Sequence, residues 1–102
     1  GITIFSQGTI INTIEIKQQE KEIATIFPNP AQATLNIELN DEFIGKLYHV
    51  TIYNALGQVI YTEKEVSNNL HQITVSDWNA GVYFVQVNSE GYISAKSVVV
   101  TH

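Results

Sequence analysis

Hydrophobic and polar residues alternate along most of this chain in the two-residue rhythm of β-structure. In residues 33–39, Leu35, Ile37 and Leu39 are separated by polar residues, which is the pattern of a strand with one buried face. The same signal predicts strands at residues 48–53, 59–62, 70–75, 82–87 and 92–101. No stretch of useful length repeats its apolar residues at helical spacing, so we predict an all-β protein.

Short turns separate these strands. Asn54-Ala55-Leu56-Gly57 predicts a hairpin, because Gly57 adopts a positive φ at little cost. Further turns are expected at residues 76–81 and 88–91. Residues 82–87 are apolar on both faces except at Gln86, as in a central strand, and Val98 and Val100 share one face of the last strand. About seven short strands predict an immunoglobulin-like antiparallel β-sandwich, with a small open barrel as the alternative.

The N-terminal part of the chain differs from the rest. Residues 17–23 (KQQEKEI) contain good helix formers but are short and uncapped, so we interpret them as a polar linker. Residues 2–5 and 9–16 have strand composition. We therefore place a C-terminal domain at residues 22–102. Residues 1–21 are either the tail of an upstream region with its linker or an extra N-terminal strand of the sheet.

Composition excludes several classes of function. With 102 residues the chain forms one domain, and its net charge of −5, from five Lys, no Arg and ten acidic residues, argues against binding nucleic acid. The absence of Cys excludes disulfides, thiolate nucleophiles and cysteine-based zinc sites. Apolar runs stay far below the ~20 residues of a transmembrane helix, so we expect no transmembrane segment.

The polar residues suggest no chemistry of their own. His49, His71 and His102 lack the spacing of metal ligands, and Asp41-Glu42 with Glu38 is expected to be a solvated acidic turn. No serine lies in a G-x-S-x-G elbow. We therefore predict no catalytic, cofactor-binding or metal-binding residues.

Aromatic residues raise one alternative. Trp78, Tyr53, Tyr61 and Tyr92 would form a sugar-stacking platform if they lay exposed on one face, although ordinary packing explains them as well. Gly81 is expected in a turn, with Tyr83 in the core and its hydroxyl bonded at the rim.

Three short motifs follow one another along the last three quarters of the chain. They are Phe27-Pro28-Asn29-Pro30; Tyr53, Asn54, Gly57 and Ile60; and Gly81, Tyr83, Val85 and Val87, with Lys96 near the end. In this order they resemble the C-terminal sorting domain of proteins exported by the type IX secretion system, over residues 25–100. Gln58 and the absence of Arg depart from the pattern, since a basic residue often follows the middle glycine.

The resemblance implies a function. A sorting domain of this kind directs an upstream cargo domain through the outer-membrane secretion machinery by protein–protein recognition, without catalysis and without a cofactor. The protein would pass through the periplasm to the cell surface or the medium. A surface sortase usually cuts the linker ahead of the domain, which places the cut at residues 18–24 here.

Two segments are candidates for recognition. The terminal strand, with Lys96, Val98, Val99 and Val100, can present an unpaired edge to a receptor, or it only completes the sandwich.

Pro28, Asn29 and Pro30 form either a docking motif or a rigid turn, because each proline fixes φ and lacks an N–H donor. The rival functions are a carbohydrate-binding module and a structural or adhesive spacer. Exposed strand edges also allow a weak homodimer.

Overall fold

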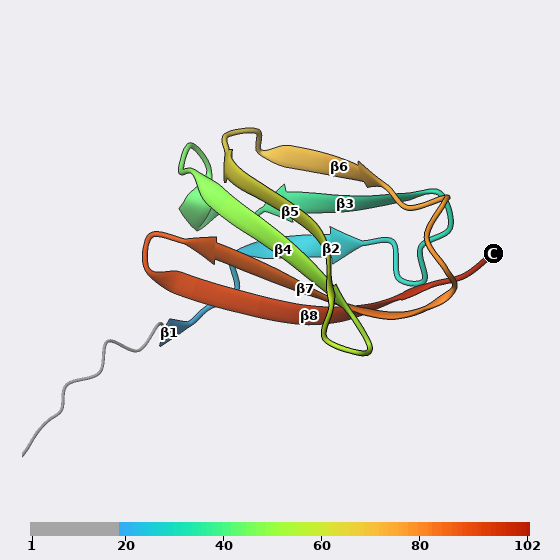
Figure 1. Cartoon of the computed structure of the whole chain (residues 1–102). Helices are drawn as coiled ribbons and strands as arrows, with labels where there is room; N and C mark the ends of the chain where they lie inside the picture. Colours follow the sequence, from blue (N-terminus) through green and yellow to red (C-terminus); the bar gives the residue numbers. More distant parts are fainter. Residues whose placement is uncertain (1–18) are drawn as a thin grey trace, which may run out of the picture.

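The computed structural model describes residues 19–102, which fold into two β-sheets packed face to face (Figure 1). The strands are β1 (Gln19–Glu20), β2 (Ala24–Phe27), β3 (Thr34–Leu39), β4 (Tyr48–Asn54), β5 (Val59–Val66), β6 (Leu70–Thr74), β7 (Gly81–Ser89) and β8 (Tyr92–Val100). The larger sheet has the order β1-β8-β7-β4-β5, and the smaller sheet has the order β2-β3-β6. The predicted sandwich is confirmed, with β1 and β2 as strands that the alternation of residues did not predict.

The core lies between the two sheets, where the apolar halves of the alternating strands meet. Val85 of β7 and Ile52 of β4 are directly paired in the larger sheet and fully buried. Leu35 and Ile37 of β3 face them from the smaller sheet and are also fully buried. Each such side chain stabilises the fold by about 1.5–3 kcal/mol through its removal from water. The period-two pattern therefore identified both the strands and the face that each of them buries.

The outer face of the larger sheet remains open to solvent. β7 is central, between β8 and β4, as its sequence predicts. Its outward-facing residues Val82 and Phe84 are nevertheless 41% and 45% exposed. The smaller sheet covers only one face of the larger one, so apolar residues on the other face stay in contact with water.

Part of the segment interpreted as a polar linker, residues 17–23, pairs with the larger sheet. Gln19 and Glu20 pair in parallel with Tyr92 and Ile93 of β8, and Ile23 is fully buried. Two polar residues carry no periodic signal for a strand. They form β1 only because β8 lies beside them and pairs with them. The proposed boundary at residue 22 remains a prediction, and the strands expected at residues 2–5 and 9–16 lie outside the described residues.

Two further segments differ from expectation in their length or type. β5 continues to Val66, four residues beyond its predicted end, through the charged residues 63–65. It lies at the edge of the sheet, where charged side chains remain hydrated. The acidic turn is a short 3-10 helix, Asp41–Phe43, which buries Phe43 and leaves its two acids in solvent.

Across residues 19–102, no helix has both the length and the hydrophobicity that crossing a membrane requires.

Candidate functional site

The terminal strand β8 has one buried and one exposed side, as its sequence predicts. Val98 and Val100 are each 1% exposed and belong to the core, whereas Val99 between them is 37% exposed on the outer face. β8 pairs with β7 along its whole length, from Ser89 with Tyr92 to Gly81 with Val100. Its other edge faces away from β7, and two segments of the chain approach it there.

The first part of this outer edge is covered by the segment that enters the domain. β1 runs parallel to β8, with Gln19 opposite Tyr92 and Glu20 opposite Ile93. The N–H of Lys21 donates to the carbonyl oxygen of Ile93 at 3.0 Å. β1 therefore lies beside the start of β8 (Figure 1).

The last part of the edge is covered by the Pro-Asn-Pro segment. The side-chain oxygen of Asn29 accepts a hydrogen bond from the N–H of Val99 at 2.9 Å, and its amide donates to the carbonyl oxygen of Ser97 at 3.4 Å. The N–H of Ala31 donates to the carbonyl oxygen of Val99, and the N–H of Thr101 donates to that of Ala31. A proline has no N–H to donate, so the carboxamide of Asn29 makes the contacts that a neighbouring strand would make.

Lys96 lies on the side of β8 that faces the core, but at the edge of the sandwich. Its ammonium group forms an ion pair with the carboxylate of Glu22, and both side chains are about half exposed. In the same segment Lys21 pairs with Glu42 at 2.5 Å and lies 4.9 Å from the centre of the Tyr92 ring. The hydrogen bond that Lys21 donates to the Glu42 carboxylate raises the pKa of Lys21. Ion pairs thus tie the entering segment to both the edge strand and the acidic turn.

The second motif builds the turn between β4 and β5. The side-chain oxygen of Asn54 accepts hydrogen bonds from the N–H groups of Leu56 and Gln58, both at 3.0 Å. The side chain of Gln58 accepts in turn from the Asn54 amide at 2.7 Å. Gly57 has φ +84°, a conformation in which a side chain would be strained. Gln58, which departs from the family pattern, therefore helps to hold this turn.

The third motif joins the core to the loop before β7. Tyr83 is 6% exposed, its hydroxyl donates to the carbonyl oxygen of Asn79 at 2.7 Å, and its ring lies 5.0 Å from that of Trp78. The expectation of a core tyrosine bonded at the rim is confirmed. Gly81, with φ +154°, starts β7 directly opposite Val100. Gly81 and the Pro-Asn-Pro segment therefore flank the same end of β8.

The aromatic residues do not share one exposed face. Trp78 packs against the core and Tyr83, whereas Tyr92 contacts Phe43 edge-on with ring centroids 6.0 Å apart. Tyr61 lies on β5, at the far edge of the larger sheet from β8, and its hydroxyl is 2.7 Å from a ring nitrogen of His71. A flat stacking platform requires coplanar exposed rings, and Trp78, Tyr61 and Tyr92 do not form one in the described structure.

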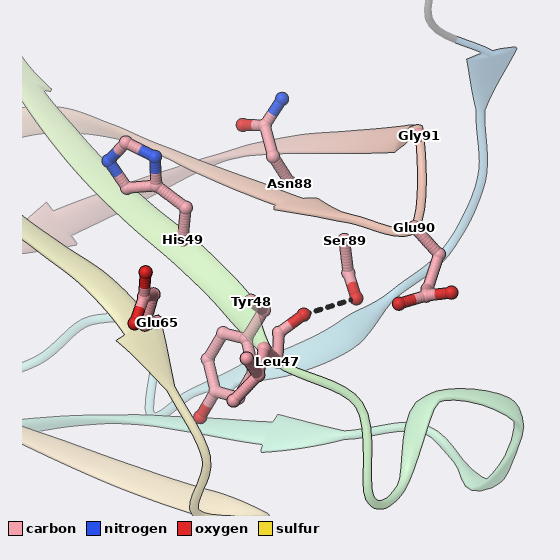
Figure 2. A pocket seen from close by; sticks show the side chains of 8 residues that line it. All are labelled: Leu47, Tyr48, His49, Glu65, Asn88, Ser89, Glu90 and Gly91. Carbon is pink, nitrogen blue, oxygen red and sulfur yellow. Dashed lines mark hydrogen bonds between the residues drawn. The ribbon is translucent and has the colours of Figure 1, made fainter.

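A shallow hollow of about 240 Å³ lies where β4 begins, at the end of the sandwich opposite to Gly81 and Val100 (Figure 2). His49, Glu65 and Glu90 line it, and Ser89 donates a hydrogen bond to the carbonyl oxygen of Leu47 at 2.8 Å. The His49 ring lies 3.1 Å from the Thr62 hydroxyl, and the two carboxylates come from β5 and from the β7–β8 turn, which β4 separates. Within residues 19–102 no group of three or more acidic or histidine side chains is arranged to hold a metal ion.

The structure thus brings most of the motif residues to one end of the sandwich. Pro28, Asn29 and Pro30 lie against the end of β8, Gly81 pairs with Val100, and the Gly57 turn lines a hollow with residues 79–83. Lys96 lies apart, midway along β8. Sequence reasoning missed β1, β2 and the side-chain pairing of Asn29. An asparagine between two prolines was the only signal for that pairing, and it did not reveal the partner strand.

Comparison with known proteins places these features in a family. A family model described as "Secretion system C-terminal sorting domain" matches residues 25–101. The ulvan lyase NLR42 of Nonlabens ulvanivorans is 25% identical over 77 residues, which are 76% of this chain and 14% of the lyase. A DUF3244 family protein from Bacteroides vulgatus with an immunoglobulin-like β-sandwich fold is 16% identical, with a TM-score of 0.60 over 74% of this chain and 82% of that one. The last similarity concerns the fold alone.

Proposed function

The chain belongs to the family of secretion system C-terminal sorting domains, and from that premise we propose that β8 is the strand that the secretion machinery recognises. The domain is a sorting signal of the type IX system, and it marks a cargo protein for export to the cell surface or the extracellular space. It interacts with the type IX machinery. The chain spans only 14% of the lyase that it matches. Our proposal adds that the cargo lies upstream and that the domain acts without catalysis.

The position of β8 supports its role in recognition. It is the last strand of the larger sheet before β1, and β1 covers only its first two residues. An edge strand offers backbone N–H and C=O groups to a partner strand, and the exposed Val99 adds an apolar contact on the outer face. The single observation that carries the proposal is that Lys96 and the exposed Val99 lie on β8, beside an outer edge that β1 pairs with at only two residues.

The test is export of a fusion in a host with a working type IX system. The whole chain would be joined to a periplasm-directed fluorescent protein, and fluorescence would be measured in the medium and on the cell surface. A control lacking residues 96–102 should not be exported, but it also removes Val98 and Val100 from the core.

A sharper pair of variants changes only exposed residues. K96Q/V99S alters β8, whereas K64Q/V59S makes the same kind of change on the opposite edge strand β5. We expect export to fall about tenfold or more in the first variant and to stay near wild type in the second, because each hot-spot residue of an interface contributes at least about 2 kcal/mol. Equal export of both variants would remove β8 from the recognition step.

We also propose that a surface sortase cuts within residues 18–24. In the described part of this window Gln19, Glu20 and Glu22 are exposed, whereas Ile23 and Ala24 are buried. A protease needs an extended and accessible backbone, so the bonds before Ile23 are the best substrates. Mass spectrometry of the exported fusion should find a new terminus there, and an intact segment in every exported molecule would contradict the cut.

A further inference from the structure

The outer edge of β8 is covered at both ends and open in its middle. The N–H of Lys21 donates a hydrogen bond to the carbonyl oxygen of Ile93. The side chain of Asn29 donates to the carbonyl oxygen of Ser97 and accepts from the N–H of Val99. Backbone groups point to alternate sides along a strand, so those of Ala95 face the same edge. Among the described residues none bonds to Ala95 on that side. A hollow of about 140 Å³ lies here, between residues 20–22 and residues 93–96.

The two covering segments make only some of the backbone hydrogen bonds that a neighbouring strand would make to β8. β1 matches two residues of β8 in parallel register, and the Pro-Asn-Pro segment contributes one side chain and an isolated bridge at Ala31. Neither segment contributes a continuous run of backbone bonds. A true strand laid along residues 93–99 would make more hydrogen bonds than the two covers together make.

The middle of β8 carries one charged side chain, that of Lys96. Lys96 is the only basic residue of β8, and the carboxylate of Glu22 neutralises it from the covering segment. An incoming strand that displaces residues 19–22 removes that carboxylate. It would have to supply another acidic side chain at the same position, because an unpaired ammonium group at the rim of the core loses a favourable contact.

We propose that residues 93–99 of β8 form a docking edge for an extended peptide strand that carries an acidic residue opposite Lys96, and that residues 19–22 cover the first part of this edge, and Asn29 the last part, until such a strand displaces them. The proposal rests on the role of β8 in recognition and adds the chemistry of the partner and a removable cover. In this scheme the partner strand itself opens the docking edge during recognition, because it takes the place of residues 19–22 before the surface sortase acts on the exported protein.

The experiment uses the complete chain and a short peptide, without any secretion machinery, so its result is independent of the export assay. The probe is a capped peptide with the sequence of residues 19–24, Gln-Glu-Lys-Glu-Ile-Ala. The opened variant is K21P/E22Q, which removes the N–H that bonds Ile93 and the carboxylate that pairs with Lys96. Binding is followed by NMR shifts of the amides of residues 93–97.

We expect the peptide to bind the opened variant at least about tenfold more tightly than wild type, since the cover competes with it in the intact chain. A peptide with the glutamate at the position of Glu22 changed to glutamine should bind about two- to fivefold more weakly, and K96Q in the opened variant should have the same effect. K64Q on β5 is the matched control and should change nothing.

Three outcomes would overturn the proposal. They are no shift in the opened variant, equal binding to wild type, and self-association of the opened variant in sedimentation, which would assign the edge to a second copy. If K21P/E22Q does not fold, E22Q alone changes no backbone group and should bind the peptide more tightly than wild type does. Failure of that increase would equally overturn the proposal.

Discussion

The two long edges of the larger sheet deal with exposed backbone groups in different ways. Among residues 19–102 no strand pairs with the outer edge of β5, and its C-terminal half carries Glu63, Lys64 and Glu65, with Glu65 at φ +55°. Charges and a local kink make such an edge a poor template for another strand. β8 instead has a single charge, Lys96, and is covered by residues 19–22 and 29–31.

The protection of the β5 edge is permanent, whereas the protection of the β8 edge is reversible. Side-chain charges on β5 cannot be removed without changing the sequence, so that edge stays closed to partners. The covers of β8 are held by few hydrogen bonds and one exposed ion pair, each of modest strength. In the proposed scheme the covers protect the β8 edge before recognition and leave it when the partner strand binds.

The largest expected effect distinguishes a core residue of β8 from an exposed residue of β5. Val98→Ala on β8 should reduce the free energy of unfolding by about 2–3 kcal/mol, because it leaves a cavity in the core. Val59→Ala on β5 should change it by less than about 0.5 kcal/mol, since Val59 is 57% exposed. Urea unfolding measures both values. Equal effects would mean that β8 does not depend on the core more than β5 does.

Alkaline pH should lower the free energy of unfolding through Tyr48 of β4, the strand that pairs with β5. Burial, with a smaller contribution from the nearby Tyr61, raises the pKa of Tyr48 to about 12. An unfolded tyrosine ionises near pH ~10. The stability from the neutral Tyr48 is therefore complete below about pH 10 and is lost as the pH rises to about 12, with a loss of about 2 kcal/mol by about pH 11.5.

Urea unfolding at a series of pH values tests this loss. Tyr48→Phe removes the hydroxyl that donates to the carbonyl oxygen of Asn68 at 2.7 Å and should flatten the alkaline decline. Burial and the charge of Glu63 also raise the pKa of Tyr61, so a smaller decline should remain. A variant that declines as steeply as wild type would assign the alkaline loss to other groups.

Removing the Asn29 side chain should uncover the end of β8. Asn29→Ala loses two hydrogen bonds to the edge strand and should cost about 1 kcal/mol, because each bond is partly exposed. The amide of Val99 should exchange with solvent faster by a larger factor than the amides of β4. Asn69→Ala in the β5–β6 turn is the control. Unchanged exchange at Val99 would show that Asn29 does not protect the edge.

The smallest expected effect concerns the ion pair at the cover. Glu22→Gln should lower the free energy of unfolding by only about 0.5 kcal/mol, since both partners are about half exposed. Added salt should reduce the difference between this variant and wild type. Glu63→Gln on β5 gives the comparison for an edge without a cover. A loss above about 2 kcal/mol would mean that the cover is part of the core rather than a removable segment.

Sequence reasoning located the regular strands well and the covering segments poorly. β3, β4, β7 and β8 were predicted within a few residues, because alternation of apolar residues reports which face is buried. β1 was taken for linker, since two polar residues have no period to detect. The role of Asn29 also escaped prediction, because its partners Ser97 and Val99 lie about 70 residues away in the chain.

The sequence by itself determined the all-β class, the burial of Val98 and Val100, the core position of Tyr83 and the order of motifs that resembles a sorting domain. These properties depend on local alternation and on residue types at fixed spacings, which are visible without the fold. Only the tertiary structure decided that Asn29, Glu22 and Lys21 meet the edge of β8. Pairing between distant segments depends on how the two sheets pack. Where no strand edge comes within hydrogen-bonding distance, the same three polar residues stay hydrated and make no such contact.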